Sequence, residues 1–245
     1  RPLAPGRLMA AAQAAALSRD ARRIHALSRD KLLQIRTLLR NANTQASIGS
    51  GFFVSADGLI VTNFHVASQL ALEPERYRGV YVTIDGQEGD VDLLAFDVQH
   101  DVAVLRARQR TAPAPVLEFR PAAEPLAQGE RIYSLGNPLD IGFAVTEGTY
   151  NGLVRRSFYP RIFFGGTLNP GMSGGPAVDD AGRVLGVNVA KRLDGEQVSF
   201  LIPAEFAQAL VQRAASAQPI TQPAHKEVAR QLLVHQQRLT ERFLQ

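Results

Sequence analysis

Residues 169–176 read NPGMSGGP, a run in which glycine and proline surround a single hydroxyl group, that of Ser173. Glycine accepts backbone angles that other residues avoid, so such a turn can aim several successive N–H groups into one small space. We therefore expect the backbone N–H groups of Gly171, Met172 and Ser173 to form a hole that binds an oxyanion. For these residues taken alone, an ordinary surface turn is the alternative.

The sequence around this turn has the texture of an all-β protein. Short runs of β-branched and aromatic residues alternate there with Gly, Asp, Asn and Pro; they include GFFV at 51–54, LIVT at 59–62, VYVTI at 80–84 and VAVL at 102–105. Many short strands at close spacing predict a barrel or a sandwich, and ADG at 56–58 predicts a hairpin turn. Four prolines between residues 112 and 125 disfavour a continuous strand, so we interpret this stretch as the link between two barrels.

Both flanks of this region favour helices. Residues 8–42 contain no Gly or Pro and repeat Leu and Ile at helical spacing. After Pro203, residues 204–215 and 226–244 also predict helices. These helices either pack on the barrels or, for the N-terminal one, mediate contacts between copies of the chain in a homo-oligomer.

The predicted organisation is therefore a β core with helices added at both ends. Its segments are an N-terminal helical segment at 1–45, a core at 46–205 with barrel one at about 46–118 and barrel two at about 125–203, and a C-terminal helical extension at 206–245.

A serine hydroxyl is a weak nucleophile at neutral pH and needs a base. The best candidate is His65, which we expect at the end of the apolar strand that begins at Leu59. A carboxylate should orient the imidazole, and Asp101 stands at the mouth of a buried strand, where an unpaired charge is costly. Asp92 and Asp97 are rivals without an adjacent strand of this kind. A structural histidine and a turn-capping aspartate are the plainer alternatives.

His100 precedes Asp101 directly and should point away from it along an extended chain. The chain order His65, Asp101, Ser173 is that of chymotrypsin. This order places the base and the acid in the first barrel and the serine in the second, so the cleft between the barrels would assemble the three.

Several stretches together resemble the HtrA/DegP-like branch of the trypsin-fold serine proteases, over about residues 47–205. They are GSGFFV at 49–54, GLIVTNFHV at 58–66, HDVAVL at 100–105, GNP at 136–138, NPGMSGGP at 169–176, GVN at 186–188 and FLIP at 200–203. The resemblance implies a chymotrypsin-like fold of two perpendicular six-stranded antiparallel β-barrels. It also implies a serine endopeptidase that hydrolyses peptide bonds through an acyl-enzyme, with His65, Asp101 and Ser173 as catalytic triad and with no cofactor or metal.

By the same resemblance, the partners are protein or peptide substrates, and the protein is exported to the periplasm or secreted, where it acts in protein quality control or regulated proteolysis. The roughly 40 residues after 205 are too few for a PDZ-like domain, so we expect the protease domain without PDZ.

Two positions depart from the family pattern. Met172 stands where these proteases usually have Asn and digestive relatives have Asp, so activation by a new N-terminal ammonium cannot operate. Ordering of loops around 140–172 and 190–198 is expected to set activity instead. Val189 stands where relatives often carry a Ser or Thr that supports the triad acid. Both departures favour an alternative, a protease-fold binding or scaffolding module with little turnover.

The resemblance also implies a specificity pocket with Thr167 near its base and Val189, Ala190 and Val198 on its walls. None of these side chains is charged, so we predict small or medium aliphatic residues before the cut. One methylene more or less on the substrate changes the free energy of transition-state binding in such a pocket by only about 1–3 kcal/mol, so selectivity between similar side chains should be modest.

The composition argues against several other kinds of protein and site. The chain has 27 Lys and Arg, 23 Asp and Glu and a net charge of +4, with the two signs interleaved, which argues against a nucleic-acid partner. It has no cysteine, which excludes disulfides, thiolate metal sites and a cysteine nucleophile. No apolar run approaches the ~20 residues of a membrane-spanning helix.

Overall fold

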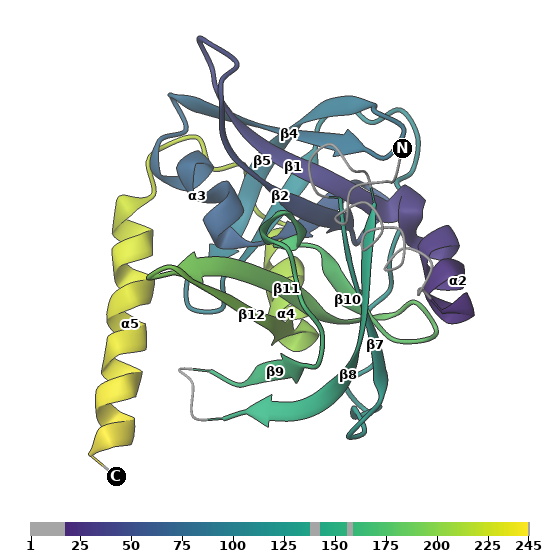
Figure 1. The fold of residues 1–245 in the computed structure, drawn as a ribbon. Helices are drawn as coiled ribbons and strands as arrows, with labels where there is room; N and C mark the ends of the chain where they lie inside the picture. The colour runs from purple at the N-terminus through teal and green to yellow at the C-terminus, as the bar shows by residue number, and fades with distance from the viewer. Residues whose placement is uncertain (1–17, 138–142, 156–158, 245) are drawn as a thin grey trace, which may run out of the picture.

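The computed structural model describes residues 18–137, 143–155 and 159–244. Its strands form two closed six-stranded barrels, in the orders β1-β2-β3-β6-β5-β4 and β10-β11-β12-β9-β8-β7. Every pair of neighbouring strands is antiparallel. The two barrels lie one above the other in Figure 1. The prediction of a chymotrypsin-like, all-β core with helices at both ends is confirmed.

The first barrel carries one helix between its strands. Its elements are β1 (Leu32–Leu39), β2 (Gln45–Phe53), β3 (Leu59–Thr62), α3 (Phe64–Leu72), β4 (Tyr77–Thr83), β5 (Glu88–Asp97) and β6 (Val102–Ala107). The hairpin predicted at 56–58 joins β2 to β3, and Gly58 takes the positive φ of 94° that this turn requires. Inside the barrel, Ile35, Phe53, Ile60 and Leu105 are completely or almost completely buried.

The second barrel contains the serine turn. Its elements are β7 (Arg131–Gly136), β8 (Ala144–Val154), β9 (Arg161–Phe164), η2 (Pro170–Met172), β10 (Pro176–Val178), β11 (Val184–Leu193) and β12 (Glu196–Pro203). A hydrophobic cluster crosses between the barrels, joining Phe52 and Val104 of the first to Tyr133 and Val187 of the second. Because this cluster is buried, the two barrels hold a fixed relative position at the seam where the candidate site lies.

The helix prediction for the N-terminal segment is only partly right. Residues 8–17 lie outside the described part; α2 (Arg19–Ser28) is a helix, with the Ser18 hydroxyl accepting from the Ala21 N–H at 3.1 Å, and η1 (Arg29–Lys31) follows it. The next residues form strand β1, which pairs with β2 and β4. The first barrel therefore begins at Leu32 and not near residue 46, because long-range pairing overrides the local helical spacing.

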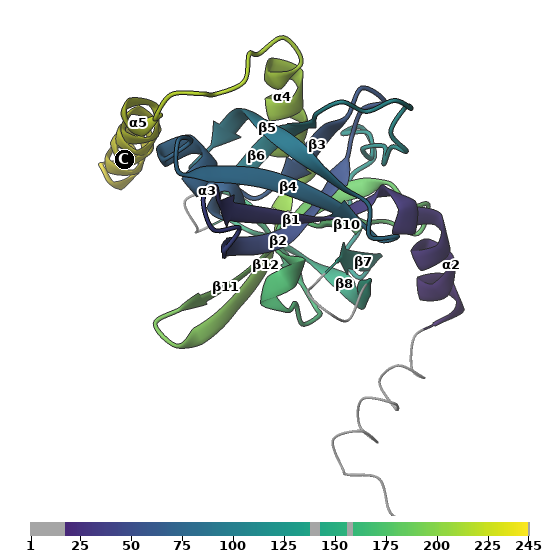
Figure 2. The same cartoon turned by 90° about the horizontal axis from the view of Figure 1, so that it is seen from above.

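The C-terminal helices agree with their prediction to within one residue. Helix α4 (Ala204–Ala214) buries Ala207 and Leu210 in the cluster between the barrels. Helix α5 (His225–Phe243) has no fully buried residue and lies along the outside of the molecule, on the side opposite α2 in Figures 1 and 2. No helix in the described ranges is long and apolar enough to cross a membrane.

Two side chains of α5 contact the first barrel: Val228 packs against its hydrophobic cluster, and Gln231 forms hydrogen bonds to its backbone. The Gln231 amide donates to the Phe96 carbonyl at 3.1 Å and accepts from the Val98 N–H at 2.8 Å. Both backbone groups lie in the segment that runs from β5 into the turn before Asp101.

Candidate active site

His65 and Asp101 are held together by two hydrogen bonds. The His65 Nδ1 lies 2.7 Å from Oδ2 of Asp101, and the His65 backbone N–H donates to Oδ1 at 2.8 Å. His65 is the second residue of α3 and does not lie on the strand, where the sequence had suggested it. The chain leaves β3 through Asn63, whose extended backbone starts the helix and whose amide donates to the Asp101 carbonyl at 2.9 Å.

The carboxylate of Asp101 is buried just before β6. Its backbone has a φ of 55°, a left-handed conformation that is uncommon outside glycine and is found at over-determined positions such as functional sites. Burial by itself raises the pKa of this group. The hydrogen bonds from His65 and the charges of His65 and Lys191 more than offset that effect, so the pKa lies below its ordinary value. The group is therefore an anion at neutral pH.

The rival residues form separate pairs. His100 Nδ1 lies 2.6 Å from Oδ2 of Asp97, and the His100 ring stacks on Phe206 with 3.8 Å between centroids. Asp92 pairs with Arg108. His100 pairs with Asp97, although residues 98–101 form a turn and not the extended chain that the sequence suggested. Within the described residues, no hydrogen bond or ion pair joins Asp92 or Asp97 to His65.

The serine turn is closed on itself. The N–H groups of Met172 and Ser173, two of the three predicted oxyanion donors, donate to Asn169 and Pro170 at 2.9 and 3.1 Å. The carbonyl of Gly171 accepts from the Ser50 hydroxyl at 2.7 Å. In this conformation the turn presents internal hydrogen bonds in place of an open anion hole, a state that the sequence pattern does not reveal.

Gly174 is the residue that lets the chain pass so close to the first barrel. Its φ is 87°, and a Cβ there would lie 2.3 Å from the Ser50 carbonyl oxygen and 2.4 Å from Oγ1 of Thr62. Only glycine fits this position, since backbone atoms cannot move aside.

The hydroxyl of Ser173 faces strand β11. It donates to the Ala190 carbonyl at 2.7 Å and accepts from the Ala190 N–H at 2.9 Å, and Ser173 is 1% exposed. No hydrogen bond joins Ser173 to His65 in the part of the chain that the structure describes. The predicted base and acid, His65 and Asp101, are thus in direct contact in the structure. The predicted nucleophile, Ser173, lies against β11, and its hydroxyl oxygen is bonded to the Ala190 backbone and not to His65.

Lys191, which the sequence analysis did not single out, joins the pair from β11. Its Nζ lies 3.1 Å from Oδ2 of Asp101, the same oxygen that His65 Nδ1 contacts. Because Lys191 directly follows Ala190, the serine turn and the His65–Asp101 pair meet at two consecutive residues of β11. Nothing local in the sequence marks this lysine, since the contact joins residues 90 positions apart.

A pocket of about 250 Å³ opens beside His65. Its lining includes His65, Asp101, Arg161, Lys191, Val198 and Phe200. The guanidinium of Arg161 lies over two rings, 4.1 Å from the centroid of Phe200 and 5.0 Å from that of Tyr159. Burial raises the pKa of Tyr159 to about 12, so its phenol is neutral beside this cation.

The four residues of the predicted specificity pocket are not gathered here. Val198 lines the pocket beside His65, whereas Val189 and Ala190 are buried and Thr167 is exposed. The pocket beside His65 therefore shares only Val198 with the specificity pocket that the resemblance implies.

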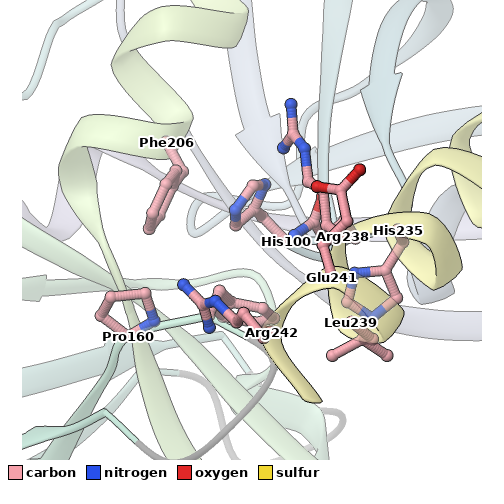
Figure 3. A pocket seen from close by; sticks show the side chains of 10 residues that line it. His100, Pro160, Phe206, His235, Arg238, Leu239, Glu241 and Arg242 are labelled. Carbon is pink, nitrogen blue, oxygen red and sulfur yellow. The ribbon is translucent and has the colours of Figure 1, made fainter. Parts of the chain in front are cut away.

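A larger cavity, of about 410 Å³, lies between α5 and the barrels (Figure 3). In Figure 3, His100 and Phe206 face it from the body of the molecule, and His235, Arg238 and Arg242 face it from α5. Gln99 and Tyr159 line both this cavity and the pocket beside His65, so the two spaces adjoin.

Comparison with known proteins agrees with this geometry. Residues 49–187 match the family described as "Trypsin-like peptidase domain". The crystal structure of Deg5 superposes with a TM-score of 0.69 at 24% identity, covering 80% of this chain and 95% of that one. That likeness concerns the fold. Two barrels around a paired His and Asp and a serine turn, together with the family match, define a trypsin-like peptidase domain.

Relatives with higher sequence identity show to which branch of the trypsin-like peptidases the chain belongs. "Probable periplasmic serine endoprotease DegP-like" of Halomonas elongata is 33% identical, over 68% of this chain and 35% of its own length. "Protease Do-like 1, chloroplastic" of Arabidopsis thaliana is 31% identical, over 71% of this chain and 41% of its own length. The chain belongs to the HtrA/DegP-like serine proteases and spans about two fifths or less of the length of these two curated relatives.

Proposed function

We propose that this chain is a serine endopeptidase that uses His65, Asp101 and Ser173 to hydrolyse peptide bonds through an acyl-enzyme. The observation that carries the proposal is the doubly hydrogen-bonded His65–Asp101 pair, with Nδ1 of the imidazole 2.7 Å from a buried carboxylate. This contact fixes the tautomer whose Nε2 can accept a proton, as a general base must.

The chemistry follows from these roles. Oγ of Ser173 attacks the scissile carbonyl carbon while Nε2 of His65 takes the hydroxyl proton, and Asp101 stabilises the imidazolium that forms. His65 then gives that proton to the leaving amine. Water attacks the resulting ester in the same way and releases the acid product. Backbone N–H groups of Gly171, Met172 and Ser173 hold the oxyanion in each half-reaction, where one such donor is worth about 2.7–4 kcal/mol.

This reaction needs a conformational step. The hydroxyl must leave Ala190 and the turn must release the N–H groups that now donate to Asn169 and Pro170. We expect the loops around 140–172 and 190–198, which lie partly outside the described residues, to order around substrate and drive this opening. Substrate binding then assembles the site, as in induced fit.

We further propose a preference for small or medium aliphatic residues before the cut, with Thr167, Val189, Ala190 and Val198 around that side chain once the turn has opened. A peptide library with every residue type at that position tests the preference. Protein substrates and an exported location are proposals by relationship to the periplasmic endoprotease of Halomonas elongata. A role in protein quality control or regulated proteolysis is a proposal from the family resemblance alone. A homo-oligomer formed through the N-terminal helix is a further proposal, and light scattering of the full chain tests it.

An active-site probe tests the enzymatic proposal. A peptidyl phosphonate with an aliphatic residue next to the phosphorus should label the wild type covalently, and Ser173→Ala should remain unlabelled in mass spectrometry. Labelling at another residue, or no labelling by phosphonate probes of any length, would contradict it.

One observation favours a second candidate, a binding or scaffolding module with little turnover. The nucleophile is occupied by Ala190 and the anion hole is closed. Such a module binds peptides without cleaving them, so wild type and Ser173→Ala would retain a peptide equally and release no product. Mass spectrometry of the peptide after long incubation separates the two candidates.

A further inference from the structure

The pocket beside His65 contains a cation that the proposed reaction does not use. Arg161 forms no ion pair with any carboxylate of the described residues, and its Nε is buried without a hydrogen-bond partner there. Its guanidinium is held instead on the faces of Tyr159 and Phe200. A partly desolvated cation without a counter-ion is costly, which points to an anion that arrives from outside.

Lys191 is the second cation of this pocket, and its present partner is a poor one for catalysis. Its Nζ and Nδ1 of His65 share one oxygen of Asp101. A positive charge about 3 Å from the triad acid weakens the field that should stabilise the His65 imidazolium during acylation. Lys191 and Arg161 outweigh the single charge of Asp101, so the lining carries a net positive charge.

We propose, on the basis of the function proposed above, that this pocket is a subsite for an acidic side chain of the polypeptide substrate. The substrate carboxylate binds Lys191 and Arg161 and draws the Lys191 ammonium away from Asp101. The same event therefore anchors the substrate and leaves the triad acid to His65 alone, so Lys191 is a specificity-determining residue that acts on the turnover step as well as on binding.

The surroundings favour an acidic stretch of polypeptide over an isolated carboxylate. The adjoining cavity under α5 presents Arg238 and Arg242, and neither forms an ion pair with a carboxylate of the described residues (Figure 3). Glu241 is the one acid in the lining of that cavity. A peptide running from the pocket beside His65 past Gln99 and Tyr159 therefore meets successive positive charges.

This subsite does not compete with the proposed aliphatic preference. Of the residues proposed to surround the side chain before the cut, only Val198 also lines this pocket, whereas Thr167, Val189 and Ala190 do not. We therefore assign the acidic side chain to a neighbouring substrate position.

Peptide cleavage provides the main test. Fluorogenic peptides that carry Val before the cut and Glu, Gln or Lys at one flanking position at a time are compared on the wild type, Lys191→Gln and Lys226→Gln. Lys226 is an exposed lysine at the start of α5 and serves as the matched control. At one position we expect Glu to exceed Gln about tenfold in kcat/KM, with part of the gain in kcat.

In Lys191→Gln, the kcat/KM values of the Glu and Gln peptides should lie within about twofold of each other. The substitution should raise kcat for the Gln peptide and lower the affinity for the Glu peptide. Lys226→Gln should keep the full ratio. Equal rates for Glu and Gln at every position on the wild type, or an unchanged ratio in Lys191→Gln, would overturn the proposal. Arg161→Lys, which keeps the charge, should retain most of the ratio, and its melting temperature reports whether the ring contacts survive.

Binding separates this inference from the enzymatic proposal. Fluorescence anisotropy with Ser173→Ala should show tighter binding of the Glu peptide than of the Gln peptide, and 0.5 M NaCl should reduce the difference. Phosphonate labelling without any Glu preference in binding or cleavage leaves a protease and rejects the subsite. A Glu preference in binding with no labelling keeps the subsite and rejects the protease.

Discussion

Ser173 and Ala190 satisfy each other's polar groups: the serine hydroxyl donates to the alanine carbonyl at 2.7 Å and accepts from the alanine N–H at 2.9 Å. A nucleophile held in this way must lose two hydrogen bonds before it can face His65. Each such bond is worth about 0.5–1.5 kcal/mol net, so the resting arrangement slows the reaction without preventing it.

The first prediction concerns the rate of labelling. A phosphonate probe with a single residue should react slowly with the resting protein, and extending the probe with a peptide of preferred sequence should accelerate labelling by about tenfold, because binding of the peptide part releases Ser173 and opens the turn. The second-order rate constants of the short and the extended probe give the comparison. Equally fast labelling by both probes would mean that the site is already open in solution.

The second prediction concerns the triad acid. Asp101→Asn should lower kcat by about four orders of magnitude with KM little changed, since the amide favours the wrong imidazole tautomer in a Ser-His-Asp triad. Steady-state kinetics on one peptide measures it. Asp92→Asn is the control, because Asp92 pairs with Arg108 away from the site. Similar kcat values for the two variants would remove Asp101 from the triad.

The third prediction concerns the serine turn. Gly174→Ala should lower the free energy of unfolding by about 2–4 kcal/mol, because the new Cβ is forced against backbone atoms at a positive φ. Gly86→Ala has a similar φ of 82° with no atom within 4 Å of the new Cβ, so it should lose only about 1 kcal/mol. Urea unfolding measures both, and equal losses would contradict the close approach at Gly174.

The fourth prediction concerns stability in acid. Burial raises the pKa of Asp97, but the hydrogen bonds and charge of His100 outweigh it and leave the pKa below its ordinary value. A group with a depressed folded-state pKa stabilises the protein fully above its unfolded pKa, about 3.9 for Asp. That contribution is lost as the pH falls through the folded pKa.

Asp97→Asn should therefore be less stable than the wild type at pH 6 in urea unfolding, and the gap should narrow toward pH 3. Asp194→Asn, a change at an exposed aspartate, is the control and should leave the pH dependence of stability as it is in the wild type. A gap for Asp97→Asn that widens in acid would refute this reading of the Asp97–His100 pair.

The site residues that could be predicted from the sequence share one property: a recognisable motif of neighbouring residues surrounds each of them. Ser173 lies between glycines, and His65 and Asp101 each adjoin a short apolar strand. Strand β1 was mistaken for helix because its leucines fit both periods, and its partner β4 lies about 40 residues away. Lys191 and Arg161 were missed for a related reason, since only the folded barrels bring them to Asp101 and to the pocket.

Helix α5 has a consequence for the chemistry that its surface position conceals. Through Gln231 it holds two backbone groups, at Phe96 and Val98, a few residues before Asp101, the acid of the proposed triad. If the proposed mechanism holds, a partner that bound the outer face of α5 and shifted this helix would change the orientation of Asp101. The rate of peptide hydrolysis would then respond to a surface that does not contact the scissile bond.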